Sequence, residues 1–161
     1  MKLHEYTNGQ AFALIILRIL IGWHLLYEGL VKVLGHGWTA ASFLAGSQGP
    51  FADLFKAMAV NPTVLVIVDQ LNQWGLVLVG LGLILGILNR WACIGGMLLL
   101  FLYYISNPPL IGIDPGIAEG NYLIVNKNLV ELFALLVLLL FPTEKIVGLR
   151  RLLPSDVGLN N

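Results

Sequence analysis

The hydrophobic positions of the chain fall into four long runs, at residues 11–34, 64–88, 91–106 and 122–141. A helix needs roughly 20 apolar residues to cross the hydrocarbon core of a bilayer, and the runs are near this length. The pattern therefore predicts an all-α fold, an integral membrane four-helix bundle that forms a single transmembrane domain over residues 1–161. The first run is longer than the apolar region of a signal peptide and holds charges, so it predicts a retained anchor.

The connections between the runs add detail to this bundle. Residues 83–91, "LILGILNRW", join the second and third helices so tightly that we expect the two to be antiparallel neighbours. The third helix should stop before Pro108 and Pro109, and Tyr103 and Tyr104 near its end suit the interfacial aromatic belt.

The first outer loop predicts an extra amphipathic helix over residues 50–60, lying at the membrane interface. Its apolar positions recur at helical spacing, with charges on the other side: Phe51, Leu54, Phe55, Met58 and Ala59 against Asp53 and Lys56. Two roles are open for this segment, an anchor on the membrane surface and a lid over a site at the outer face.

The loop charges predict the orientation. One side of the bundle holds both termini and the second loop, with five cations: Lys2, Arg90, Lys145, Arg150 and Arg151. The other side holds one cation against three acids: Lys56 against Asp53, Asp114 and Glu119. The positive-inside rule then predicts a multi-pass protein of a bacterial-type inner (plasma) membrane, with both termini cytoplasmic.

Composition agrees with this prediction and narrows the chemistry. The chain is 58% hydrophobic and 11% charged, which is typical of a membrane protein, and its zero formal charge gives no reason to expect nucleic acid. Cys93 is its single cysteine, so an internal disulfide and a C-x-x-C redox pair are excluded.

The first run carries polar residues that share one helical face: Arg18, His24, Glu28 and Lys32, together with Gly22 and Gly29. Glycines on a membrane helix let a second helix approach closely. We therefore expect this face to be turned into the bundle, away from lipid.

The second and fourth runs supply partners for that face: Asp69 and Asn72, and then Lys127, Asn128 and Glu131. Three cations (Arg18, Lys32 and Lys127) match three acids (Glu28, Asp69 and Glu131), as burial in a low dielectric requires. At about 1.5 Å of rise per residue, most of these groups lie in the outer leaflet, with Arg18 beneath them as a floor. The sequence thus predicts an outward-facing polar pocket.

The residue types in this pocket indicate proton chemistry and binding of a polar head group. We assign His24, Glu28 and Glu131 as candidate catalytic acids and bases, because a histidine exchanges protons near neutral pH. Candidate ligand-binding residues are Arg18, Lys32, Asp69, Asn72, Lys127 and Asn128. Neither a haem motif nor a metal motif is recognised. The sequence does not identify the cofactor, and a quinone is the candidate. A network that only holds the helices in register is the structural alternative.

Two stretches, "LRILIGWHLLYEGLVK" and "GLVLVGLGLILGILNRWACIGGM", resemble the DoxX family of membrane proteins. The matching positions are Arg18, Gly22, Gly29, Lys32, Gly86 and Arg90, whereas "NQWG" stands where many relatives carry an acid. The resemblance implies a four-helix membrane bundle with a redox association. Related DoxD-type proteins are subunits of thiosulfate:quinone oxidoreductase, other relatives accompany thiol or superoxide-defence enzymes, and an animal relative is an assembly chaperone for nicotinic receptors.

Together these features predict a redox-associated membrane subunit that binds a quinone or a small polar or sulfur-containing substrate in the outward-facing pocket. As an enzyme it would be a quinone-linked oxidoreductase subunit. The alternative is a non-catalytic membrane scaffold or assembly chaperone. A transporter is disfavoured, because the sequence has no detectable internal repeat and no inner-side polar path. The lipid bilayer is the expected partner, and a redox partner protein and a second copy of the chain are candidate partners.

Overall fold

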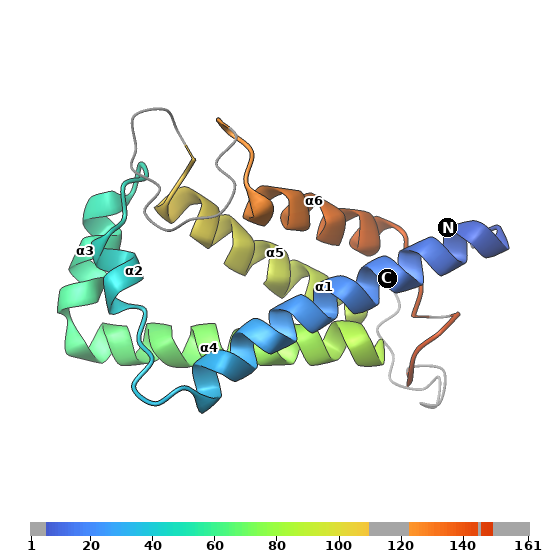
Figure 1. Cartoon of the computed structure of the whole chain (residues 1–161), viewed down its shortest axis with the longest axis horizontal. Coiled ribbons are helices and arrows are strands. Elements are labelled where there is room, and N and C mark those ends of the chain that lie inside the picture. The colour runs from blue at the N-terminus through green and yellow to red at the C-terminus, as the bar shows by residue number, and fades with distance from the viewer. Residues whose placement is uncertain (1–5, 110–122, 145, 150–161) are drawn as a thin grey trace.

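The computed structural model describes residues 6–109, 123–144 and 146–149, which form helices joined by turns and loops. The helices, shown in Figure 1, are α1 (Asn8–Leu34), α2 (Ala41–Ala45), α3 (Ala52–Val60), α4 (Pro62–Leu85), α5 (Asn89–Ser106) and α6 (Lys127–Leu140). The fold is therefore all-helical over the described part of the chain, as predicted.

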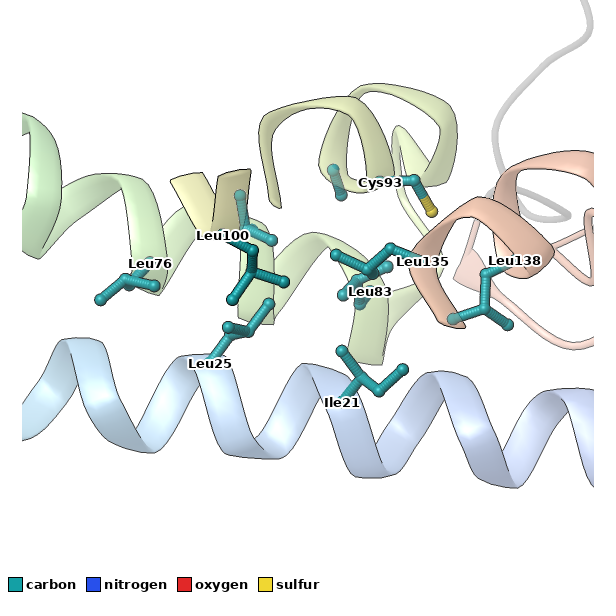
Figure 2. Packing of buried hydrophobic residues seen from close by; sticks show 10 residues of the cluster. Ile21, Leu25, Leu76, Leu83, Cys93, Leu100, Leu135 and Leu138 are labelled. Carbon is teal, nitrogen blue, oxygen red and sulfur yellow. The ribbon is translucent and has the colours of Figure 1, made fainter. Parts of the chain in front are cut away.

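The four longest helices pack around one hydrophobic core. α1 lies along α4, α5 packs against both α4 and α6, and α6 touches α1. Each of these helices contributes buried side chains, among them Leu25, Leu83, Leu100 and Leu135 (Figure 2). Burial and close packing of these apolar side chains against one another stabilise the arrangement of the four helices.

Glycines allow the closest of these contacts, between α1 and α4. A Cβ on Gly29 would lie 2.7 Å from the backbone nitrogen of Val77, and a Cβ on Gly80 would lie 2.5 Å from that of Leu26. Both distances are shorter than real Cβ contacts allow. The prediction that the glycine face of the first helix packs closely on another helix is thus confirmed, and the partner is α4.

A tight turn joins α4 to α5. Gly86 ends α4 in the left-handed conformation, with a φ of 65°, and its N–H donates to the carbonyl of Gly82. Leu88, with a φ of 52°, is also left-handed and begins α5. The turn reverses the chain at once, which confirms that these helices are antiparallel neighbours (Figure 1).

α2 and α3 cover the end of the molecule where α5 finishes and α4 begins (Figure 1). The carbonyl of Ser106, at the end of α5, accepts hydrogen bonds from the hydroxyl of Ser47 and from the N–H groups of Gln48 and Gly49. At the same end of the molecule, Phe55 of α3 packs with Ala40 and Leu44 in a small second core. α3 falls within the predicted segment 50–60, and Leu54 of this helix and Phe51, which directly precedes it, stay exposed.

The fourth long helix begins later than residue 122, which lies outside the described residues. Asn126 caps α6, because its side chain accepts a hydrogen bond from the N–H of Leu129, and Leu123 has a left-handed φ of 63°. α6 is 14 residues long, or about 21 Å. That is less than the roughly 30 Å of a bilayer core.

Among the described residues, two helices, α1 and α4, are long and apolar enough to cross a membrane. Only 33% of the most apolar window of α1 and 22% of that of α4 are buried. Large apolar side chains such as Leu20 and Leu78 therefore face outward. An apolar surface of this extent is compatible with membrane association.

Candidate functional site

A cavity of about 320 Å³ lies between the C-terminal halves of α1 and α5, the N-terminal halves of α4 and α6, and the segment around α2. Seven of the nine site residues predicted from the sequence line it: His24, Glu28, Lys32, Asn72, Lys127, Asn128 and Glu131. Leu25, Leu76 and Leu100 add apolar wall. The structure thus brings polar groups of three helices to one place, whereas Arg18 and Asp69 lie elsewhere.

His24 and Glu131 form an ion pair that links α1 to α6. The imidazole Nδ1 lies 2.5 Å from the carboxylate Oε1, without the alignment of a regular hydrogen bond. The side chains are 34% and 21% exposed, so solvent reaches both. This pair can therefore hold or release a proton at the cavity wall.

Lys32 is held by four neighbours at the C-terminal end of α1. Its ammonium Nζ lies 3.2 Å from Oδ1 of Asn72 and 3.8 Å from Oε2 of Glu28. It also lies 5.2 Å from the ring centre of Trp38 and 5.5 Å from that of Tyr103, which are cation–π distances. The lysine charge is thus satisfied by the protein itself.

Tyr103 and Trp38 are cavity residues that the sequence did not reveal. The sequence predicts an interfacial position for Tyr103, yet its ring lines the cavity and its hydroxyl oxygen accepts a hydrogen bond of 2.6 Å from Asn72 Nδ2. Phe43 packs against it edge to face, with ring centres 5.8 Å apart. An aromatic residue near a helix end has the same local sequence pattern whether it lies at a membrane interface or lines a cavity. Only the packing of the helices distinguishes the two positions.

Lys127 is a cation of the cavity for which the described residues provide no ion pair. Its expected partner one helical turn later, Glu131, pairs with His24 instead, and Glu28 lies beside Lys32. Within the described residues, no carboxylate forms an ion pair with Lys127. The side chain, which is exposed, therefore offers a positive charge to whatever enters the cavity.

Asp69 has a structural place beside the cavity. Its Oδ1 accepts a hydrogen bond of 2.7 Å from the backbone N–H of Ala40, which itself lines the cavity. The carboxylate thus fixes the segment that leads into α2, and its hydrogen bond goes to this segment rather than to one of the predicted cations. We expect an indirect role for Asp69, through the position of this wall.

Arg18 lies near the opposite end of the four-helix core and is not the floor of the cavity. Its guanidinium is 1% exposed and donates to the hydroxyl of Thr143 at 3.1 Å and to the carbonyl of Val147 at 2.6 Å. Glu144, which accepts a hydrogen bond from Asn89, is close enough to act on Arg18 electrostatically. The partners of Arg18 lie about 125 residues along the chain, and no local pattern marks them.

The cavity combines polar side chains with an apolar wall, which is the usual form of a site for a small organic molecule. Among the described residues, no group of three His, Cys, Asp or Glu side chains is placed to hold a metal ion.

The search of family models, of curated proteins and of solved structures found no match. The resemblance to the DoxX family therefore stays a prediction, and function has to be inferred from the cavity.

Proposed function

We propose that the chain is a redox-associated subunit of a bacterial-type inner membrane, a four-helix bundle whose outward-facing cavity binds a quinone head group or a small polar or sulfur-containing substrate. One observation carries the proposal. The same apolar-walled cavity is lined by the acid–base pair His24 and Glu131 and by the cation Lys127. Convergent polar groups in an apolar cavity are the usual form of a small-molecule site.

The size of the cavity supports a head group as the occupant. At about 320 Å³ it lies at the small end of the range for ligand sites, roughly 300–1,000 Å³. A quinone ring fills such a volume, and an isoprenoid tail would lie outside it, along the apolar outer surface of the helices. Leu25, Leu76 and Leu100 would contact the ring faces.

The ionisable residues fit the proton requirement of quinone chemistry. Reduction of a quinone to a quinol consumes two electrons and two protons. A reduced sulfur compound or a redox partner protein would supply the electrons, since the chain has one cysteine and that residue is buried. His24 would pass a proton to a quinone oxygen while Glu131 orients and charges the imidazole, and Glu28, 44% exposed, would connect the site to solvent.

The test is to purify the protein in a mild detergent without added quinone, extract it with organic solvent and quantify quinone per protein chain. We expect near-stoichiometric quinone with the wild type. We expect a large loss in His24→Phe, which fills the cavity, and in Lys127→Met, which removes its unpaired cation.

Lys56→Met is the matched control, because Lys56 is exposed on α3 and does not line the cavity. It should retain the wild-type quinone content. Quinone-free wild-type protein, or equal losses in all three variants, would contradict the proposal. Well-folded protein without quinone would favour the alternative function, a non-catalytic scaffold that uses exposed apolar residues such as Phe51 and Leu54.

A further inference from the structure

A chain of polar contacts crosses the cavity wall from α1 through α4 to α5. Lys32 Nζ donates to Asn72 Oδ1 at 3.2 Å, and Asn72 Nδ2 donates to the hydroxyl oxygen of Tyr103 at 2.6 Å. Both polar ends of the Asn72 side chain are therefore used. Tyr103 is the end of the chain and lines the cavity.

The direction of these hydrogen bonds is fixed by Lys32. An ammonium group can only donate, so it must face the carbonyl oxygen of the Asn72 amide. If the amide were turned round, two donors would meet at Lys32, and that arrangement is unfavourable. The NH₂ group therefore faces Tyr103, and the tyrosine oxygen has to accept. Its own hydroxyl hydrogen is left to point elsewhere.

The ring of Tyr103 is held in one orientation. The ring of Phe43 packs against it edge to face, at 78° between the ring planes. The ammonium of Lys32 lies over the Tyr103 ring, 5.5 Å from the ring centre. A hydroxyl on a fixed ring has a defined position, which is what selective recognition of a ligand atom requires. Lys32, surrounded by its own partners, does not compete for that atom.

We propose that Tyr103 is a specificity-determining residue of the cavity, donating its hydroxyl hydrogen to a carbonyl or other acceptor oxygen of the bound molecule, with Asn72 and Lys32 as positioning residues. The inference rests on the proposed function, because it names how the occupant of the same cavity is recognised. A quinone head group meets the requirement, since its ring oxygens are acceptors. A ligand that offers only donors at this wall does not.

The direct test measures binding of a decyl-substituted 1,4-benzoquinone to the full chain in detergent, by quenching of tryptophan fluorescence. Tyr103→Phe removes the hydroxyl and keeps the ring. Asn72→Asp keeps the size of the side chain but offers an acceptor to Tyr103, which turns the hydroxyl hydrogen away from the cavity. We expect each change to weaken binding about 3- to 10-fold, the value of one ordinary hydrogen bond. The double variant should lose no more than Tyr103→Phe alone.

Tyr104→Phe is the matched control, because the hydroxyl of Tyr104 donates to the carbonyl of Ile124 and does not line the cavity. It should bind the probe like the wild type. Unchanged binding in Tyr103→Phe overturns the inference while the proposed function stands, and so does unchanged binding in Asn72→Asp. Failure of the wild type itself to bind overturns the proposed function.

A second measurement tests the hydroxyl direction without any ligand. The intensity ratio of the tyrosine Fermi doublet in the Raman spectrum distinguishes a hydroxyl that accepts from one that donates. The difference between wild type and Tyr103→Phe isolates Tyr103, and we expect it to report an acceptor. In Asn72→Asp the corresponding difference should report a donor. A donor signal in the unliganded wild type would overturn the inference whatever the binding data show.

Discussion

Arg18 is the residue whose position differs most from its expected role, and its contacts predict a structural effect. Replacing it by methionine leaves the Thr143 hydroxyl and the Val147 carbonyl, both near a buried Glu144, without their donor. Loss of one partner from a buried charged network costs about 3–5 kcal/mol. We expect Arg18→Met to lower the free energy of unfolding by about that amount, measured by denaturation in mixed micelles.

Arg18→Lys keeps the charge but cannot reach both acceptors with one forked group, so it should recover only part of the loss. Quinone content per folded chain should stay at the wild-type level in both variants, because Arg18 does not line the cavity. Wild-type stability combined with lost quinone would contradict this assignment and favour the floor position that the sequence predicts.

Single residues also show which parts of the candidate site could be predicted from the sequence. Charged and amide residues within apolar runs stand out, since each needs a reason to enter a low dielectric, and seven of them line the cavity. Tyr103 and Trp38 did not stand out, because aromatic residues are ordinary in such runs. Spacing along one helix placed Arg18 with His24, but about 9 Å of helix rise separates them. Its partners come from a distant segment that no periodicity reveals.

At the scale of elements, the packing of the helices predicts opposite effects of the same substitution at two glycines, one in the contact between α1 and α4 and one facing α5. Gly29→Ala forces a methyl group against the backbone of Val77, and we expect a destabilisation of about 1–3 kcal/mol. Gly75→Ala, on α4, places its methyl group 3.4 Å from a flexible atom of Leu99. It should be neutral or stabilise by up to about 1 kcal/mol, because alanine favours the helix.

Unfolding in mixed micelles measures both variants, and the double variant should show the sum of the two effects. A stable Gly29→Ala protein would mean that α1 and α4 are further apart than the structure places them. The sequence could predict that α1 packs closely on another helix, because glycines at helical spacing let two helices approach, but it did not say which helix. It could not predict where α6 begins, since that depends on the cap made by Asn126.

At the scale of the whole molecule, the two ends differ in chemistry. The cavity, α2 and α3 occupy one end, and the N-terminus of α1 and the partners of Arg18 occupy the other (Figure 1). Fourteen residues of α1 separate Arg18 from Lys32, which is about 21 Å along the helix. A protein that crosses a membrane in the proposed orientation therefore presents the cavity to the outer side and places Arg18 with its partners Thr143 and Val147 toward the inner side.

Cysteine labelling in intact cells tests this orientation, because the chain has one cysteine and it is fully buried. The wild type should not react with a membrane-impermeant maleimide, whether cells are intact or permeabilised. Lys56→Cys, exposed on α3, should react in intact spheroplasts, since the proposed topology places it outside. Asn8→Cys, exposed at the start of α1, should react only after permeabilisation.

Reaction of both variants in intact spheroplasts, or reaction of Lys56→Cys only after permeabilisation, would contradict the topology and move the cavity away from the outer face. Because Asn8 and Lys56 are exposed and do not line the cavity, we expect both substitutions to leave the fold unchanged, so that their labelling reports the orientation.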